Sequence, residues 1–353
     1  MKVAIYTIAK DEESFVERWY NSAKDADYLL IADTGSSDDT VSIAKSLGIK
    51  VVSIDINPWR FEDARNAALA FLPKDIDMCI SLDMDEVIKE NWRKPLEEAF
   101  NSGITRPRYK HVWSWKKDGT PDLEFGYDHI HTRHGYRWKH PVHETLYPYG
   151  NFEEKIGFVS GLETYHYPDH QKSRGQYLLL LKMSIVEDSQ NERNSYYYAR
   201  ELFFHDEKTQ SAEEFKRYLS LPTATWAAER SSALRYLAKC EPENAEKYLS
   251  EACTTAPDRR EPIVELAYFA YLKNNWKLCY SNSIKAITIK EKPLDYLCEE
   301  FAWGSAPFDL AAISAYNLEK YEDAIKYNLI ALELSPKDSR LIKNMYHYQQ
   351  AIK

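Results

Sequence analysis

The chain has 353 residues, a formal net charge of −9 and an aromatic content of 14%. This length favours two domains, and the 44% of hydrophobic residues is enough to build packed cores, which excludes a generally disordered protein. The negative charge argues against a surface covered with basic residues that bind nucleic-acid phosphates, but it is compatible with a local basic groove.

Cysteine usage and hydropathy bear on the cellular compartment. The five cysteines never occur as Cys-x-x-Cys, so we expect reduced core thiols rather than disulfides or a zinc site. No apolar run approaches the roughly 20 residues that span a bilayer. Met1–Tyr6 leads directly into a strand and lacks the shape of a signal peptide. We therefore expect a cytoplasmic protein without a membrane partner.

Strand-like and helical stretches alternate over the first 85 residues. The expected strands are Val3–Ala9, Tyr28–Ala32, Val51–Ile54 and Ile76–Leu82. The expected helices run from Lys10 to about Ala23, from the turn-rich loop Asp33–Asp39 to Leu47, and from Glu62 to Phe71. This alternation predicts a Rossmann-like α/β fold, with a mainly parallel sheet covered by helices on both faces.

The fourth of these strands ends in Leu82-Asp83-Met84-Asp85-Glu86. Ligands of open α/β sheets bind beyond the carboxyl ends of the strands, where Asp83 and Asp85 fall. Two carboxylates at this spacing can reach one hard divalent cation, which then holds substrate phosphates. The alternative is that the acidic residues only cap the next helix.

Residues 101–150 have a different composition. They contain eight Lys and Arg against five Asp and Glu, with six of the ten histidines. We name this segment the basic strip. Its alternation and turn signals indicate antiparallel strands and loops. Such a strip beside a carboxylate cluster indicates a polyanionic or sugar-bearing ligand, and the alternative is a set of half-buried strand histidines.

From about residue 173 onward the hydrophobic period is helical, and the sequence repeats itself. Small residues at Ala233, Ala245 and Ala252 recur 34 residues later, and they recur again after a further 45 residues. This pattern predicts tetratricopeptide repeats over about 226–259, 260–293 and 305–338, with an insertion near 291–304 and a capping helix after the third repeat. We therefore expect a domain over 1–172 and an all-α repeat domain over 173–353.

The N-terminal half resembles the family 2 glycosyltransferases that have the A-type nucleotide-sugar fold. The closer resemblance is to a bacterial and phage branch with C-terminal tetratricopeptide repeats, which includes the sublancin-type peptide S-glycosyltransferases. The resemblance rests on these segments, taken together in this order: Thr7–Glu12, Ile31–Thr40, Phe61–Asn66, Leu82–Glu86, Pro141–Glu144 and His166–Tyr167.

This resemblance implies a metal-dependent transfer of one sugar from a UDP-sugar, with inversion. Asp33 would receive the uracil or the adjacent nucleoside edge, with Thr7 and Ala9 in the same pocket and Glu12 and Met84 at its border. Arg65 would reach the nucleotide with Asn66 nearby, and Asp83 would face the ribose. Asp85 and His166 would bind Mn²⁺ or Mg²⁺, a cation that neutralises a leaving diphosphate without proton transfer.

The transfer also needs a base that takes a proton from the acceptor. The resemblance points to Glu144, next to His143, for this role. The Glu-Asp pair that many family members use is missing from this chain. In the alternative, Glu144 only pairs with Arg137 or Lys139. Gln171–Arg174 differs from the motif of processive synthases.

The acceptor and the whole-protein role remain open at this level. A concave repeat surface suits an extended polymer, which puts a peptide or protein side chain first, a hydroxymethylated base of phage DNA second and a glycan third. A homo-oligomer is also left open. Two rival classes are a non-catalytic repeat scaffold with a relic sugar-nucleotide domain and a nucleotidyltransferase. The second would carry a glycine-rich phosphate loop, and residues 7–13 contain no glycine.

Overall fold

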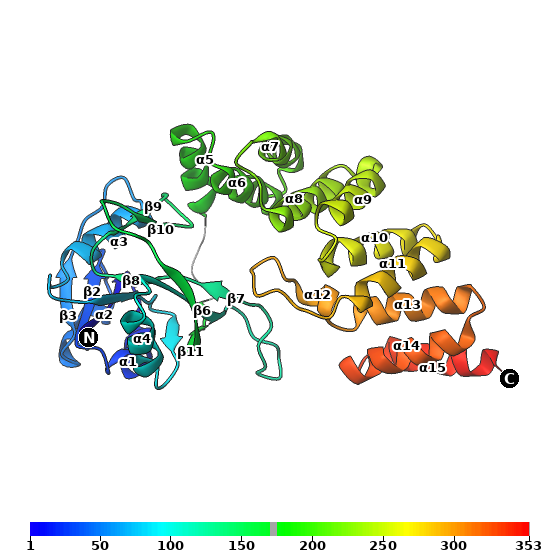
Figure 1. The fold of residues 1–353 in the computed structure, drawn as a ribbon, viewed down its shortest axis with the longest axis horizontal. Coiled ribbons are helices and arrows are strands. Elements are labelled where there is room, and N and C mark those ends of the chain that lie inside the picture. Colours follow the sequence, from blue (N-terminus) through cyan, green and yellow to red (C-terminus); the bar gives the residue numbers. More distant parts are fainter. Residues whose placement is uncertain (170–174, 353) are drawn as a thin grey trace. The chain divides into compact units, whose positions relative to one another are not determined.

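The computed structural model describes residues 1–169 and 175–352. The chain divides into two compact units, Met1–Ser184 (unit 1) and Ile185–Lys353 (unit 2). The boundary that we expected at 172/173 falls outside the described residues, as does the segment Gln171–Arg174. Figure 1 shows an α/β unit followed by a helical one, which confirms the expected fold class.

Unit 1 is built around a five-stranded sheet in the order β3-β2-β1-β4-β8. Its strands are β1 (Val3–Ala9), β2 (Tyr28–Asp33), β3 (Lys50–Ser53), β4 (Met78–Ser81) and β8 (Ile130–Thr132). The first four strands are parallel, and β8 pairs with β4 in the antiparallel direction. The parallel part matches the sequence prediction to within two residues at nearly every strand end, whereas β8 was not predicted as part of this sheet.

Helices cover both faces of this sheet, because alternate residues of its strands point to opposite sides. Helices α1 (Glu13–Ala23), α2 (Thr40–Ser46) and α4 (Arg93–Asn101) pack on one face against side chains such as Ile5 and Ile80. Helix α3 (Phe61–Ala70) packs on the other face against Tyr6 and Leu30. Each fully buried aliphatic side chain in these layers contributes about 1.5–3 kcal/mol to folding.

A second sheet adjoins the carboxyl end of β4. It has the order β5-β11-β6-β7, and a separate small ribbon, β10-β9, packs on α3. The strands are β5 (Glu86–Ile88), β6 (Arg106–Val112), β7 (Glu124–Tyr127), β9 (Tyr136–Lys139), β10 (Thr145–Pro148) and β11 (Ile156–His166). Strand β11 pairs with β5 so that His166 lies opposite Glu86. This register brings the end of β11 to the acidic segment that follows β4.

Helix α5 (Tyr177–Glu187) crosses the boundary of the units, and unit 2 continues as antiparallel helix pairs. The pairs are α6 (Glu192–Phe204) with α7 (Lys208–Ser220), α8 (Ala227–Cys240) with α9 (Ala245–Thr255), α10 (Arg260–Leu272) with α11 (Trp276–Thr288), and α13 (Ala306–Asn317) with α14 (Tyr321–Leu334). Helix α15 (Ser339–Ala351) packs on α14, and the short α12 (Glu300–Trp303) lies between α11 and α13.

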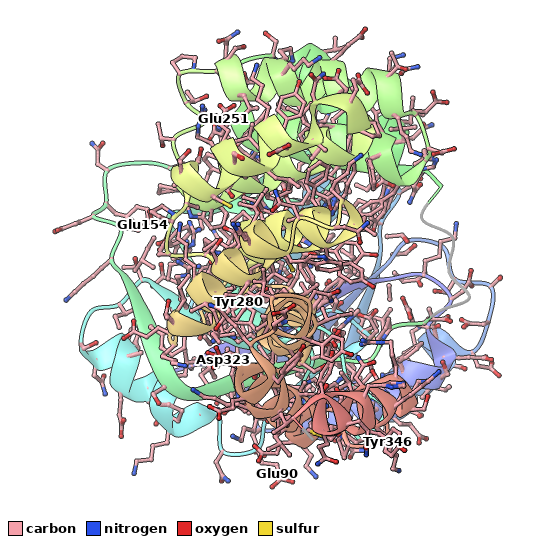
Figure 2. All side chains as sticks on the ribbon, turned by 90° about the vertical axis from the view of Figure 1, so that its right-hand side faces the viewer. Glu90, Glu154, Glu251, Tyr280, Asp323 and Tyr346 are labelled. Carbon is pink, nitrogen blue, oxygen red and sulfur yellow. The ribbon has the colours of Figure 1, made fainter. Side chains whose placement is uncertain are left out.

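Small residues permit the close packing of these helices. Ala233, Ala267 and Ala312 are fully buried at equivalent places of α8, α10 and α13. Successive pairs are also linked by polar contacts, since the Tyr280 hydroxyl donates to Asp323 Oδ2 at 2.6 Å. Both of these side chains are labelled in Figure 2.

Four of the five cysteines are buried. All five cysteines are free, and burial raises the pKa of the Cys79 thiol to about 12, which makes it unreactive. Among the described residues, we find no helix that combines the length and the apolar character needed to cross a membrane.

Candidate active site

Unit 1 contains a cavity of about 750 Å³ at the carboxyl ends of β1 and β4. Its walls come from the segment after β1, the residues before and at the start of α3, the acidic segment after β4, and the region around the start of α5. The lining residues are Ile8–Glu12, Thr34, Asp55, Ile56, Trp59, Phe61, Arg65, Asp83–Asp85, Pro168, Asp169, Gln176 and Tyr177. A cavity of this size accommodates a nucleotide-sized ligand.

Arg65 is the central charged group of this cavity. It projects from α3, is only 4% exposed, and donates through Nη1 and Nη2 to the two carboxylate oxygens of Asp83 at 2.8 and 3.0 Å. Nη1 also donates to Ser81 Oγ at 2.8 Å. Burial disfavours the charged form of Asp83, but the adjacent Arg65 guanidinium holds the pKa of this carboxyl below its usual value. This fork fixes the orientation of Asp83.

Glu144 binds the same arginine from the opposite side. Arg65 Nε donates to Glu144 Oε1 at 2.5 Å, and the Glu144 side chain is 9% exposed. The partner of Glu144 is therefore neither Arg137 nor Lys139, the two residues that the sequence alternative proposed. Proximity in sequence was misleading here, because the Glu144 segment folds back onto α3. Four of the five N–H groups of Arg65 are thus bonded to protein acceptors.

Asp85 and His166 meet through the pairing of β5 with β11. His166 Nε2 lies 3.2 Å from Asp85 Oδ2, and His166 Nδ1 lies 2.9 Å from the backbone oxygen of Trp113. Because a carbonyl oxygen can only accept, Nδ1 carries a proton. The indole of Trp113 stacks on the imidazole with ring centroids 4.1 Å apart, and the Tyr167 N–H bonds to the Asp85 carbonyl at 2.8 Å. The pair is therefore fixed in place.

The Asp85 and His166 pair fits a divalent cation. With His166 Nδ1 protonated, a neutral imidazole turns the lone pair of Nε2 toward a carboxylate oxygen. Two acceptors at this distance need either a proton or a cation between them. Adjacent ligands of an octahedral cation with bonds of about 2.1 Å lie about 3 Å apart, close to the distance observed. The carboxylate suits Mn²⁺ or Mg²⁺, and the imidazole favours Mn²⁺ of the two.

No larger metal cluster is present in the described part of the chain. Within residues 1–169 and 175–352, no three His, Cys, Asp or Glu side chains converge as a preformed metal site. A two-residue site agrees with the usual binding of Mg²⁺-type cations, which take one or two protein ligands and complete their shell with water and substrate phosphates.

A buried layer that the sequence did not predict supports the acidic segment. Glu86 Oε2 accepts the Asp83 N–H at 3.2 Å, and His111 Nε2 lies 3.7 Å from Glu86 Oε1. Burial, together with the charges of Asp83 and Asp85, raises the pKa of Glu86 well above its usual value. Burial also lowers the pKa of His111 to about 3. Two features of the sequence could have pointed to this layer: the apolar residues around His111 in β6, and the run of acidic residues that contains Glu86.

The basic strip is partly buried in unit 1. His111, His129, His131 and Trp138 are buried, which favours the alternative of core histidines for these positions. Two of its cations are paired, since Arg106 contacts Asp128 and Glu154 and Lys110 contacts Glu124 and Glu163. Other basic residues of the strip are exposed, namely Arg108, Lys116, Lys117 and Arg137. The binding of a polyanionic ligand by the strip stays a prediction.

The other predicted residues divide into those that line the cavity and those that support it. Ala9, Glu12 and Met84 belong to the lining. Thr7 is fully buried and donates to the Ile8 oxygen. Asp33 accepts the N–H groups of Gly35 and Ser36, where Gly35 has a φ of 98° that suits glycine. Asn66 bonds to both backbone polar groups of Trp138, and the His143 ring lies 5.8 Å from that of Tyr177.

Four predicted residues lie outside the lining of this cavity, namely Thr7, Asp33, Asn66 and His143. Their side chains bond to local backbone groups or pack on neighbouring elements, and their roles toward a nucleotide or an acceptor stay predictions. The direct contact of Arg65 with a nucleotide stays a prediction, since the structure shows its guanidinium bonded mainly to Asp83 and Glu144.

Comparison with known proteins places unit 1 in a family. Residues 4–143 match the family model "Glycosyl transferase family 2". An "Uncharacterized glycosyltransferase" of Rickettsia bellii is 33% identical over 102 residues, which is 29% of this chain and 33% of the relative. The chain thus spans about a third of the length of this curated relative.

Two solved structures are similar at low identity. S. aureus TarS 1–349 has 14% identity and a TM-score of 0.45, covering 71% of this chain and 91% of that one. Glucosyl-3-phosphoglycerate synthase from Mycobacterium tuberculosis, solved with Mn²⁺, UDP and glucosyl-3-phosphoglycerate, has 22% identity and a TM-score of 0.28, covering 31% and 44%. The family model covers residues 4–143, which hold most of the main sheet and the acidic segment, and identifies this part of the chain as a family 2 glycosyltransferase domain.

Proposed function

We propose that the protein is an inverting, metal-dependent glycosyltransferase that moves one sugar from a UDP-sugar to a polypeptide side chain. The observation that carries this proposal is the paired geometry at the end of β4. There, Asp83 is oriented by Arg65, and Asp85 faces His166 at 3.2 Å beside a cavity of about 750 Å³.

The donor half of the reaction uses the acidic segment. Asp85 and His166 would hold Mn²⁺ or Mg²⁺, and the bound cation supplies charge neutralisation for the departing diphosphate. Asp83, locked by Arg65, accepts from a ribose hydroxyl. Ala9 and Glu12 border the part of the cavity next to β1, which is suited to the nucleoside.

The acceptor half uses Glu144. Its Oε1 is held by Arg65, while Oε2 has no hydrogen-bond partner among the residues that the structure describes. We assign Oε2 the role of proton acceptor for the attacking group. The Arg65 contact orients the carboxylate, so that proton removal and displacement of the diphosphate can proceed in one inverting step.

The identity of the acceptor is inferred from the electrostatics of both units. DNA was favoured only by the basic strip, in which His111, His129 and His131 are buried and Arg106 and Lys110 are paired with acids. Stacked helix pairs, such as those of unit 2, present extended surfaces that suit a polypeptide. A polypeptide is therefore our first acceptor class, ahead of modified DNA and glycans.

The test is transfer by the purified full-length protein. Candidate peptides, glycans and hydroxymethylated DNA are incubated with a panel of UDP-sugars and Mn²⁺, and products are identified by intact mass. Addition of one hexose-type mass to a peptide supports the proposal. Asp75→Asn, at an exposed acid paired with Lys2, is the matched control for charge-removing variants of the site.

Two results would overturn the proposal. Transfer only to DNA or to a glycan would exclude the polypeptide acceptor. Absence of both transfer and UDP-sugar hydrolysis under all metal conditions would favour the rival hypothesis of a repeat scaffold with a relic domain.

A further inference from the structure

A second cluster of chemistry-bearing side chains lies in unit 2, around Arg200 of α6. The Arg200 guanidinium lies over the ring of Tyr197 at 4.6 Å and near that of Tyr196 at 6.0 Å. Tyr236 of α8 and Tyr296 of the insertion between α11 and α13 are also close enough to act on its charge. Four tyrosines from three parts of the sequence therefore surround one cation.

Arg200 differs from the other arginines nearby because it has no acidic partner. Arg235 pairs with Glu265 at 2.8 Å and with Glu299 at 2.7 Å. Throughout residues 1–169 and 175–352, by contrast, no hydrogen bond or ion pair reaches the Arg200 guanidinium. Arginine stays charged at all relevant pH values, so a half-buried cation keeps its donors available for a ligand.

The surroundings of Arg200 are rigid. The Tyr196 hydroxyl bonds to Ser232 Oγ at 2.7 Å. The Tyr296 hydroxyl donates to Glu229 Oε2 at 2.5 Å, and its ring stacks on Tyr197 with centroids 6.1 Å apart. The insertion that interrupts the 34-residue repeat thus supplies one wall of the cluster. A preorganised wall lowers the entropic cost of binding.

We propose that Arg200 anchors a carboxylate-binding site, and that its ligand is an acidic side chain of a polypeptide. A guanidinium fork matches a carboxylate in two parallel hydrogen bonds. The tyrosine faces can pack on the methylene groups of the bound side chain. Phe204, one helical turn beyond Arg200, is 63% exposed and offers contact to an apolar neighbouring residue.

Charges of both signs lie near the site. Glu229 lies behind Tyr296, and the charge of Glu299 acts on Tyr236, while the Arg193 guanidinium lies over the Tyr197 ring at 4.8 Å and its charge acts on Glu229. The fork of Arg200 matches the two oxygens of one carboxylate, whereas the second charge of a phosphate group would meet Glu229 and Glu299. Nucleic acid is disfavoured for the same reason, since its backbone needs a series of cations. The site is a binding site in its own right and does not depend on which reaction unit 1 catalyses.

The experiment uses the full-length protein and a displayed library of random peptides. Peptides selected by the wild type are compared with those selected by Arg200→Gln. We expect the wild type to enrich a fixed Asp or Glu beside an apolar residue, and the variant to lose this acidic position. One selected peptide and its Glu→Gln or Asp→Asn counterpart are then titrated against each protein by fluorescence anisotropy.

The wild type should prefer the acidic peptide by about 10- to 100-fold, as expected for a charged hydrogen-bonded pair, and Arg200→Gln should bind both peptides equally. Lys247→Gln removes the same charge from an exposed position on α9 and should keep the preference. Arg200→Lys keeps a cation over Tyr197 but not the fork, so its preference should fall several-fold. If Arg200→Gln does not fold, Arg200→Lys decides the question.

Three outcomes would overturn the proposal. The first is an undiminished acidic preference in the folded Arg200 variants, and the second is the absence of acidic enrichment by the wild type. The third is a phosphorylated peptide or a single-stranded oligonucleotide that depends on Arg200 while the acidic peptide does not.

Discussion

At the scale of single residues, Arg65 connects the two halves of the candidate active site. It binds Asp83 and Glu144, which are far apart in the sequence, through one guanidinium. A buried cation between two carboxylates is stable only while both remain in place, because removal of one partner leaves uncompensated charge. In the proposed mechanism, one side chain therefore orients both the donor-binding Asp83 and the base Glu144.

The metal assignment predicts a specific loss on substitution of Asp85. Asp85→Asn keeps the shape of the side chain but removes the charge that attracts a cation, so UDP binding should lose its dependence on Mn²⁺. Calorimetric titration of UDP with and without Mn²⁺ measures this effect, with Asp75→Asn as the control. Metal-dependent affinity that is unchanged in Asp85→Asn would contradict the assignment.

The base assignment predicts that Glu144→Gln affects turnover more than donor binding. Loss of a general base costs about 10²- to 10⁴-fold in rate, whereas UDP-sugar affinity should stay within a few-fold of the wild type. The drop should be smaller for a thiol acceptor, which ionises more readily than a hydroxyl.

Glu154→Gln is the matched control for Glu144→Gln, because Glu154 also pairs with an arginine, but with Arg106 rather than with Arg65, which holds Asp83. Rates and affinities are compared in proteins with equal thermal midpoints. Transfer to a hydroxyl acceptor at the wild-type rate in Glu144→Gln would remove Glu144 from the mechanism.

At the scale of elements, β8 attaches the second half of unit 1 to the main sheet through a directed chain of hydrogen bonds. Trp138 Nε1 donates to the Tyr6 hydroxyl at 2.8 Å, and that hydroxyl lies 3.2 Å from His131 Nε2. His131 Nδ1 lies 2.8 Å from the Thr132 oxygen and carries the proton. Burial lowers the pKa of His131 to about 4. The hydrogen bond to the Thr132 carbonyl acts in the opposite direction and raises this pKa, whereas the charges of Arg133 and Arg106 lower it further.

This pKa predicts a loss of stability in mild acid. The unfolded His131 has a pKa of about 6.5, so the unfolded chain takes up a proton between pH 6.5 and 4 while the folded chain does not. The contribution of neutral His131 is therefore complete above pH 6.5 and decreases as the pH falls, by about 2 kcal/mol at pH 5.

Urea unfolding of the wild type and of His131→Gln at pH 7 and pH 5 tests this prediction. On going from pH 7 to pH 5, the wild type should lose about 2 kcal/mol more unfolding free energy than His131→Gln. His134→Gln, at an exposed histidine, should show no such shift. If the difference in unfolding free energy between the wild type and His131→Gln were the same at pH 7 and pH 5, the buried, neutral state of His131 would be contradicted.

Periodicity and turn residues were sufficient to predict β1 to β4, the three helices between them and the repeat pattern of unit 2, because these features are local. They did not reveal that β8 joins the main sheet or that β5 pairs with β11, since short strands carry little pattern. The pairing of Asp85 with His166 came only from family resemblance. The ion pair of Arg65 with Glu144 spans 79 residues and left no local signal.

At the scale of the whole molecule, we expect unit 1 to bind the sugar donor and unit 2 to help hold the acceptor. A protein that ends after Ser189, beyond the end of α5, should keep Mn²⁺-dependent UDP binding, because all lining residues of the cavity lie before position 178. Its transfer to a polypeptide acceptor should fall by at least about tenfold if unit 2 holds the acceptor, equivalent to about 1.4 kcal/mol of binding.

Circular dichroism and a thermal melt establish that the shortened protein is folded before rates are compared. Full-length transfer rates in such a protein would contradict an acceptor-holding role for unit 2. Loss of UDP binding as well would show instead that unit 1 needs unit 2 for its own folding.

The pairing of β5 with β11 has a consequence for how the protein is made. Asp85 is synthesised 81 residues before His166, so the Asp85–His166 pair cannot exist until β11 has left the ribosome and found its place between β5 and β6. Such long-range pairing forms slowly compared with the local helix pairs that follow. If this pair binds a cation as proposed, the cation would stabilise only the finished domain, and more so at higher cation concentration. Newly made chains in a metal-poor cell would accordingly spend longer in a state open to proteolysis.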